Sequence, residues 1–336
     1  MQRTAALELW LQSQTPDRAF VLAPASADAS FRRYYRVRYA DGATRIVMDA
    51  PPEHEDVRPW LTVQRLLAEA GVRVPEVYAA DLAQGFLLLG DLGETTYLAA
   101  LAKADGRRIE ELYRAAIDTL IRLQCASRPG LLPAYDRALL RREMELFLDW
   151  YCARHLGKPL AEAKLAQLYD VFEAILAVNL GEPAVFVHRD YHSRNLMVVA
   201  DENAPAVIDF QDAVYGPISY DLVSLLKDAY NELPEEFALD LIARYWEKAR
   251  KVGLPVRHDF AEFFRDYEWM GVQRHLKVLG IFARLSHRDG KHGYLDDMPL
   301  VGRQLRSVCA RYGALKPLRR LLDELEERAV VHGYIF

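Results

Sequence analysis

Two carboxylates and one amide occur at a spacing that suits the transfer of a phosphoryl group. Asp190 and Asn195 stand five positions apart in a polar segment between the apolar runs at 186–187 and 196–199. Asp209 comes fourteen positions after Asn195 and also ends an apolar run. Phosphoryl transfer needs a carboxylate that orients the attacking hydroxyl and accepts its proton, and oxygen ligands that hold Mg²⁺ against the phosphates of ATP. We therefore predict that Asp190 is the catalytic base and that Asn195 and Asp209 bind Mg²⁺.

Polar residues that simply close loops between strands are the other interpretation of this pattern, and for one isolated Asp that interpretation usually holds. Here, however, two separate elements follow one another as H-x-D-x-x-x-x-N and then I-D-F, an order that is typical of kinases. Each element also follows an apolar run of the kind that forms a buried strand. The order and the spacing together favour catalysis over loop closure.

The elements that must position these residues fall into two regions. In the first 90 residues, apolar patterns predict strands at 18–23, 31–39, 44–49, 76–80 and 86–90 and helices at 4–14 and 56–70. Asp41-Gly42 between the second and third strands is a strong hairpin signal, and Gly71 stands where the second helix would end. This region therefore reads as a small antiparallel sheet with a helix.

Beyond the breaker cluster at 90–94 the pattern becomes mainly helical. Apolar residues at i, i+3 and i+4 predict helices at 109–126, 137–153, 161–180, 220–230, 235–251 and 260–285, and short strands are predicted at 184–187, 196–199 and 206–210. We therefore predict an α+β protein with two lobes. Residues 1–90 would form the nucleotide-binding lobe, 91–95 the hinge, and 96–336 a helical lobe with the catalytic loop and the acceptor site.

Composition excludes several classes of protein. The formal charge of -5 and the pI near 6.0 argue against a nucleic-acid binder. Cys125, Cys152 and Cys309 are far apart and form no CxxC, so neither a disulfide framework nor a Cys-type zinc site is expected. No apolar run approaches the ~20 residues that span a bilayer, and the N-terminus lacks a signal-peptide pattern. A cytoplasmic protein without membrane partners is expected.

The strongest family motifs lie in residues 186–228. His192 stands two residues after Asp190, where protein kinases usually carry Lys, and Asp221 opens an apolar helix only twelve residues after Asp209. With these motifs the chain resembles the aminoglycoside-phosphotransferase and choline-kinase branch of the protein-kinase-like fold over nearly its whole length. The resemblance implies a two-lobed protein-kinase-like fold. It also implies that His188 is a packed scaffold residue, and that Asp221 holds the backbone of the catalytic loop and caps its own helix.

The nucleotide lobe departs from this family pattern. The strand at 44–49 contains no Lys, and no G-x-G-x-x-G loop is present. The corresponding turn supplies small residues and two arginines, and the predicted nucleotide contacts there are Ser26, Ser30, Arg32 and Arg33. Either arginine could replace the missing positive charge, or both could lie on a solvated strand face. The segment at 88–92, with Leu89 and Asp91, is expected to present backbone groups to adenine.

The acceptor is expected to be neutral or anionic. Arg274, Lys277 and Arg284 recur at spacings of three and seven, so they can lie on one helix face. Such a face suits a neutral or anionic sugar better than a polycation, although a solvated helix surface is an equal alternative. The predicted acceptor contacts are Asp190, Gln211, Asp212, Tyr215, Arg274, His275 and Lys277.

Within the family, the segments at 207–213, 215–217 and 273–285 are most similar to bacterial anomeric sugar kinases. Those kinases phosphorylate the 1-hydroxyl of N-acetylmuramate and N-acetylglucosamine in peptidoglycan recycling. The resemblance implies the same reaction here, with ATP and Mg²⁺ and a small-molecule sugar as partner. A monomeric chain is the working expectation, although the sequence does not determine the oligomeric state. Two alternatives stay open. One is an aminoglycoside or amino-alcohol phosphotransferase of the same fold, and the other is a catalytically dead kinase-like binding module, which the missing Lys would favour.

Overall fold

The structure, a computed structural model, describes residues 2–27, 31–199 and 204–326. The chain forms two compact units, the first made of residues 1–123 and 194–212 and the second of 124–193 and 213–336. The segment predicted as the catalytic loop, 188–195, therefore begins in the second unit and continues along the chain into the first. The proposed lobe boundary at residue 90 and the hinge at 91–95 stay predictions.

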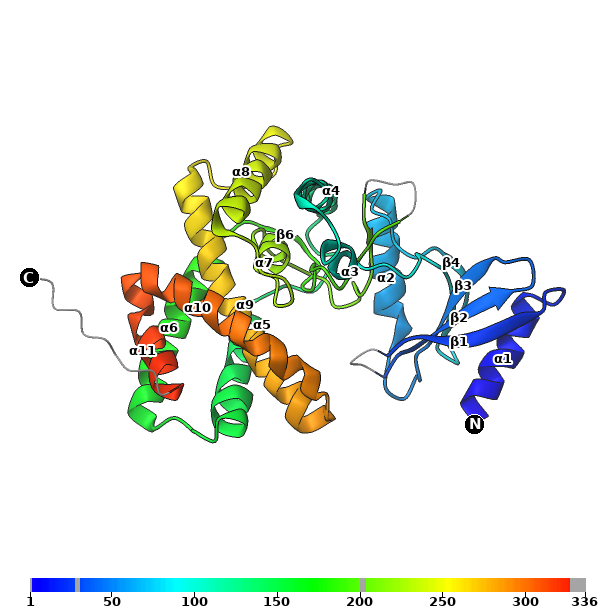
Figure 1. Ribbon diagram of the computed structural model, residues 1–336, viewed down its shortest axis with the longest axis horizontal. Helices are drawn as coiled ribbons and strands as arrows, with labels where there is room; N and C mark the ends of the chain where they lie inside the picture. The colour runs from blue at the N-terminus through cyan, green and yellow to red at the C-terminus, as the bar shows by residue number, and fades with distance from the viewer. Residues whose placement is uncertain (1, 28–30, 200–203, 327–336) are drawn as a thin grey trace, which may run out of the picture. The chain divides into compact units, whose positions relative to one another are not determined.

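A five-stranded antiparallel sheet forms the centre of the first unit (Figure 1). Its strands are β1 (Phe20–Ala27), β2 (Arg33–Tyr39), β3 (Thr44–Asp49), β4 (Val77–Asp81) and β5 (Phe86–Gly90), in the spatial order β1-β2-β3-β5-β4. Arg38 pairs with Thr44 across a tight turn, in which Gly42 has a φ of 84° that glycine adopts at little cost. The hairpin predicted from Asp41-Gly42 is confirmed.

Two helices accompany this sheet. The helix α1 (Gln2–Gln14) packs Leu7, Trp10 and Leu11 against Val37 and Val47 in the core of one sheet face. The helix α2 (Val57–Glu69) begins at Asp56, whose carboxylate accepts a hydrogen bond from an amide of its first turn. It ends before Gly71, which has a φ of 71°, as the sequence predicts.

The rest of the first unit consists of helices and a short strand ladder. It contains α3 (Tyr97–Leu101), most of α4 (Gly106–Cys125) and a two-stranded ladder of β7 (Leu196–Met197) and β8 (Ala206–Val207). The amide of Val207 donates to the carbonyl of Arg73 just after α2, and the amide of Val198 donates to that of Thr95. These bonds tie the short ladder to the rest of the unit.

The second unit is mainly helical. Its elements are α5 (Arg137–Leu146), the π-helical segment η1 (Phe147–His155), α6 (Glu162–Asn179), β6 (Ala184–Val187), β9 (Val214–Pro217), α7 (Tyr220–Leu226), α8 (Glu235–Lys251), α9 (Phe260–Asp289), η2 (His292–Asp297), α10 (Met298–Arg311), η3 (Gly313–Leu315) and α11 (Lys316–Leu325). The long helix α9 runs through the centre, and α5, α6, α7 and α10 pack against it (Figure 1). Gly280 permits its close crossing with α5, because a Cβ there would lie 2.4 Å from the carbonyl carbon of Leu146.

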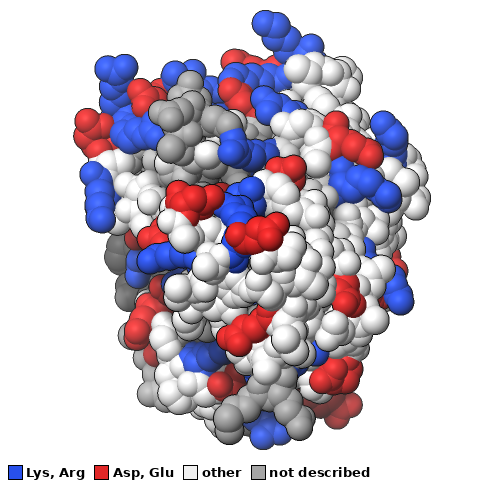
Figure 2. Space-filling view, turned by 90° about the vertical axis from the view of Figure 1, so that its right-hand side faces the viewer, with Lys and Arg blue, Asp and Glu red and all other residues white. Residues whose placement is uncertain are grey.

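Most predicted elements are present, and the α+β class with an antiparallel sheet followed by a mainly helical chain is confirmed. Three differences stand out. The helix predicted at 137–153 turns π-helical at Phe147, the helix predicted at 220–230 ends at Leu226, and β9, α10 and α11 were not predicted. Within the described residues, no helix has the length and apolar character needed to cross a membrane. On the face shown in Figure 2, basic and acidic side chains are interspersed, in agreement with the small net charge.

Candidate active site

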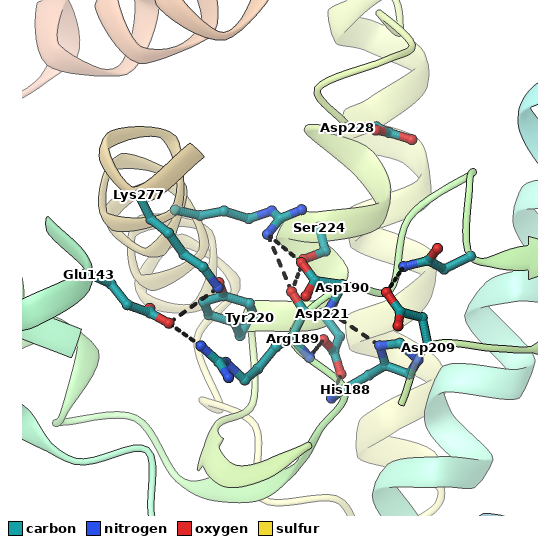
Figure 3. A network of polar contacts seen from close by, with 12 residues as sticks. Glu143, His188, Arg189, Asp190, Asp209, Tyr220, Asp221, Ser224, Asp228 and Lys277 are labelled. Atoms are coloured by element: carbon teal, nitrogen blue, oxygen red, sulfur yellow. Dashed lines mark hydrogen bonds and ion pairs between the residues drawn. The ribbon is translucent and has the colours of Figure 1, made fainter. Parts of the chain in front are cut away.

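The catalytic-loop segment follows β6 and is held by one buried carboxylate. Asp221, in the first turn of α7, accepts a hydrogen bond from the amide of His188 at 2.6 Å and from the amide of Arg189 at 3.0 Å (Figure 3). The tie to the loop that the family resemblance implies is therefore present. The predicted capping of α7 by Asp221 is wrong, because Ser219 occupies the N-cap position and no side chain caps the helix. Burial raises the pKa of Asp221 to about 6.

Arg189 adopts a backbone conformation that is unusual for a residue with a side chain. Its φ is 75°, in the left-handed region that costs a non-glycine residue roughly 1–2 kcal/mol. Its amide is held by Asp221, its carbonyl accepts a hydrogen bond from Ser224, and its guanidinium binds the carboxylate of Glu143. These contacts offset the backbone strain and fix the orientation of the backbone that leads into the next residue, Asp190.

The predicted base, Asp190, keeps an accessible carboxylate. Its side chain is 38% exposed, and Nη1 of Arg274 lies 3.8 Å from its Oδ1. Burial opposes ionisation, but the charges of Lys277 and Arg274 outweigh it and lower the pKa of Asp190 well below the ordinary value for aspartate. The carboxylate is therefore ionised near neutral pH and can accept a hydrogen bond from a substrate hydroxyl.

The basic residues of α9 are buried rather than solvated. Nζ of Lys277 lies 2.9 Å from the hydroxyl of Tyr220 and 3.3 Å from Oε1 of Glu143, and Arg274 donates to the carbonyl of Arg189 at 3.3 Å. The alternative of a solvated helix surface is therefore wrong for these two residues, because buried charges require partners and both have them. Their contacts in the structure are to the loop and to its supports.

The histidines near the loop are buried and packed. Burial lowers the pKa of His192 to about 4, and its ring meets that of Tyr230 edge to face. Burial also lowers the pKa of His275 to about 3, and the ring is only 1% exposed on α9. The position of His275 gives no support to the acceptor contact predicted for it, because no surface of the ring is open to a ligand. His188 is buried as well, as expected for a scaffold residue.

Asp228 is a support of the loop that sequence reasoning missed. Its carboxylate accepts hydrogen bonds from the amide of Ser193 at 3.0 Å and from the hydroxyl of Ser193 at 2.5 Å. Asp228 comes seven positions after Asp221, two residues beyond the end of α7. In the helix predicted at 220–230, a spacing of seven would place both acids on one face, so this pair was a usable signal.

In the first unit, the β7–β8 ladder places the two predicted metal ligands side by side. Leu196 pairs with Val207, and the amide of Ile208 donates to the carbonyl of Asn195. As a result, Nδ2 of Asn195 lies 3.4 Å from Oδ2 of Asp209. Asp209 has a φ of 63°, a second left-handed residue outside glycine. The carboxylate is one-third exposed, so a ligand can reach it.

The donor set at this ladder fits a magnesium ion. A carboxylate and an amide supply the hard oxygen ligands that Mg²⁺ prefers, and the remaining positions are usually taken by water and phosphate. Rotation of the Asn195 amide by half a turn would place its oxygen where Nδ2 now lies, 3.4 Å from Asp209 Oδ2. Adjacent oxygens around Mg²⁺ stand about 3 Å apart, given bond lengths of about 2.1 Å. The arrangement therefore needs only a small adjustment.

Neighbouring residues support the Asp209 carboxylate. Nε2 of Gln211 donates to Oδ1 of Asp209 at 2.9 Å and lies 3.3 Å from Asp212. The ring of Trp60 on α2 packs against that of Phe210 at 5.0 Å.

Tyr215, in β9 of the second unit, is half-buried, and its backbone bonds to the segment that precedes α5. The sugar contacts predicted for Gln211, Asp212 and Tyr215 stay predictions.

Four of the predicted nucleotide-binding residues come from the segment at 26–33, and the structure describes three of them. Nη2 of Arg32 lies 3.5 Å from Oδ1 of Asp209, whereas Arg33 is exposed on β2. Ser26 lies in β1, and Ser30 lies outside the described residues.

The other two predicted nucleotide residues serve the sheet with their side chains. The carboxylate of Asp91 binds Arg36 at 2.7 Å and the amide of Gly93 at 2.9 Å, and the side chain of Leu89 is buried in β5. Only their backbone groups therefore remain as candidates for a contact with adenine, as the sequence analysis expects.

Comparison with known proteins agrees with this arrangement. The profile of the phosphotransferase enzyme family matches residues 21–253, a range that contains Asp190, Asn195 and Asp209. The N-acetylmuramate/N-acetylglucosamine kinase of Neisseria meningitidis is 50% identical and covers 97% of this chain and 96% of its own length. The protein of that name from Pseudomonas aeruginosa is 47% identical and covers 97% and 98%.

A solved structure supports the fold. The choline kinase LicA from Streptococcus pneumoniae matches with a TM-score of 0.65 and 13% identity, and covers 91% of this chain and 100% of that chain. At this level of identity, the match bears on the fold alone. The predicted protein-kinase-like fold class is confirmed.

Proposed function

Since the chain belongs to the phosphotransferase enzyme family, we propose that it is an ATP-dependent sugar kinase that phosphorylates the anomeric hydroxyl of N-acetylmuramate and N-acetylglucosamine. The choice of acceptor is supported by the names of the two relatives at 50% and 47% identity, which match nearly the whole chain. The proposed role in the cell is the recycling of peptidoglycan sugars.

The observation that carries the phosphoryl-transfer proposal is the fixed and accessible carboxylate of Asp190. In the proposed reaction this carboxylate accepts a hydrogen bond from the sugar 1-hydroxyl and so orients its oxygen toward the γ-phosphorus. The oxygen forms a bond to the γ-phosphorus while the bond from that phosphorus to the β,γ-bridging oxygen breaks. ADP leaves, and the hydroxyl proton passes to Asp190.

Asp190 acts as a weak base in the proposed reaction. Any aspartate carboxylate is far less basic than a sugar alkoxide, and the lowered pKa of Asp190 makes it weaker still, so the hydroxyl proton moves late in the reaction. The anomeric hydroxyl is the most acidic hydroxyl of a reducing sugar, because the ring oxygen stabilises the resulting alkoxide. Among the hydroxyls of the sugar, it therefore transfers its proton most readily to a weak base such as Asp190.

On the nucleotide side, Asn195 and Asp209 would hold Mg²⁺, and the ion would supply charge neutralisation at the β- and γ-phosphates. Arg32 is proposed as the cation that replaces the missing strand Lys, because its guanidinium already lies next to Asp209. Gln211 donates to Oδ1 of Asp209, the same oxygen that Arg32 approaches, and so keeps the carboxylate oriented.

The test is a panel of acceptors incubated with ATP and Mg²⁺, with the products identified by phosphorus NMR. The panel contains N-acetylmuramate, N-acetylglucosamine, an aminoglycoside and choline. The expected product is a sugar 1-phosphate, which is recognised by coupling of its phosphorus to the anomeric proton. A 6-phosphate would exclude the anomeric assignment. Transfer only to the aminoglycoside or to choline would favour the alternative phosphotransferase, and no transfer at all would favour the binding module.

A further inference from the structure

We propose that Glu143 of α5 is a positioning residue for the catalytic loop: by binding the side chain of Arg189 it fixes the strained backbone that presents Asp190. Glu143 was absent from the residues predicted from sequence, and it lies 46 positions before Arg189 in the chain. The kinetic part of this inference rests on the proposed kinase function, whereas the structural part can be tested without it.

The carboxylate of Glu143 is saturated with donors. It accepts from the guanidinium of Arg189 and lies 3.3 Å from Nζ of Lys277 (Figure 3). It also accepts from the hydroxyl of Tyr135 and, at 3.1 Å, from Nε2 of Gln273. The residue is only 5% exposed. A carboxylate this deep requires paired charge, and the two cations lower its pKa despite the burial that opposes ionisation.

Glu143 is also the carboxylate that balances two buried cations. Lys277 and Arg189 both point at it, and its carboxylate forms an ion pair with each of them. Loss of the Glu143 charge would leave two buried cations beside the loop without their partner. Their field would then act on the other carboxylates near the loop, that of Asp190 among them.

Arg189 is thereby anchored at two separate points. Its backbone amide binds Asp221, and its side chain binds Glu143. Its left-handed backbone, with a φ of 75°, persists only while the surroundings hold it. Because Asp190 is the next residue, the direction of its carboxylate depends on this conformation.

The aromatic contacts around Glu143 join both anchors. The ring of Tyr135 meets that of Tyr220 edge to face at 5.1 Å, and the hydroxyl of Tyr220 accepts from Lys277. Tyr220 opens α7, the helix that carries Asp221. Gly216 leaves room for Tyr135, because a Cβ at that position would lie 2.5 Å from the Cβ of Tyr135. The same packed cluster therefore fixes both Glu143 and α7, the helix that carries Asp221.

The experiment compares Glu143→Gln with Glu143→Asp and with a matched control, Asp266→Asn. Asp266 is an equally buried carboxylate of the second unit that binds Arg257 at 2.8 Å and Arg265 at 2.9 Å, and it has no contact with the loop in the structure described. We expect Glu143→Gln to lower kcat about 10- to 100-fold while the KM for ATP changes less than about twofold. Glu143→Asp restores the charge and should recover most of kcat, and Asp266→Asn should keep it.

Hydrogen exchange measured by mass spectrometry gives the readout that is independent of turnover. In Glu143→Gln the peptide that covers residues 188–193 should exchange roughly tenfold faster, and in Asp266→Asn it should exchange at the wild-type rate. Unchanged exchange in Glu143→Gln would overturn the inference, whether or not the protein phosphorylates sugars. Faster exchange throughout the protein in both variants would also overturn it, because the effect would then be general destabilisation.

A double-variant cycle that combines Glu143→Gln with Arg189→Met tests whether Glu143 acts through Arg189. If Glu143 acts through Arg189, the combined variant should have a kcat within about threefold of the poorer single variant. Losses that multiply would refute the route. Asp190→Asn is assayed in parallel: if it keeps turnover, the proposed role of Asp190 fails, and the exchange result still decides the case of Glu143.

Discussion

The guanidinium of Arg32 lies 3.5 Å from the carboxylate of Asp209, although 177 positions separate the two residues in the chain. Arg32 is also 3.9 Å from Glu55, and its side chain is only 9% exposed. A cation held in this way next to a predicted metal ligand can serve the phosphates that the metal would bind. A cation at this place explains why the site can do without a Lys on β3.

Replacement of Arg32 by Met should therefore weaken nucleotide binding. We expect the KM for ATP to rise about tenfold, because a charge-assisted contact to phosphate contributes roughly 1.5–3 kcal/mol, while the KM for the sugar changes little. Steady-state kinetics with each substrate varied in turn would measure both. The matched control is Arg33→Met, since Arg33 is the adjacent residue and is exposed on β2. An equal effect of the two replacements would contradict the assignment.

Replacement of Asp190 by Asn should abolish turnover and leave the fold intact. The amide keeps the shape of the side chain but cannot accept the hydroxyl proton, so we expect kcat to fall about 10²- to 10⁴-fold. The melting temperature should stay within a few degrees of the wild type, because the carboxylate is 38% exposed and the amide has the same shape. A variant with more than about a tenth of the wild-type kcat would rule out a base at this position.

Local patterns in the sequence predicted most of the fold. The Asp41-Gly42 hairpin is present, and α8 covers the predicted range of 235–251 at both ends. The catalytic-loop motif was equally visible, because its residues are close together in the chain. Short periodic signals of this kind need no knowledge of distant contacts.

Contacts between distant residues were not predictable in the same way. Arg274 and Lys277 read as a polar helix face, yet both are buried, because Glu143 and the loop neutralise them. The pairings that bury them link α9 with α5 and with the segment after β6. Charged residues are seldom buried without such partners, so a sequence pattern alone assigns them to the surface.

Removal of divalent metal should stop the reaction. Asn195 and Asp209 offer the hard oxygens of a Mg²⁺ site, so excess EDTA should abolish turnover and added Mg²⁺ should restore it. Asp209→Asn should raise the Mg²⁺ concentration needed for half-maximal activity about tenfold or more, since a charged ligand is lost. A titration of rate against free Mg²⁺ measures the shift. Full activity in EDTA would contradict the metal site.

Glu182 should make the stability of the protein depend on pH. Burial raises its pKa to about 8, from an ordinary value near 4.5, although hydrogen bonds from Ser219 favour the ionised form. Because the pKa is raised in the folded state, the contribution of this group to stability is complete below pH 4.5 and is lost as the pH rises through 8. The free energy of unfolding should fall over this window by on the order of 5 kcal/mol.

Glu182→Gln isolates this effect. The amide has the shape of the protonated carboxyl, can accept from the amide of Ser219 and can donate to its hydroxyl, so the folded state keeps both contacts. Urea unfolding at pH values from 5 to 9 should show that the variant matches the wild type at pH 5 and exceeds it at pH 9, because the buried ionisation is gone. Parallel pH profiles of the two proteins would show that Glu182 does not titrate in this range.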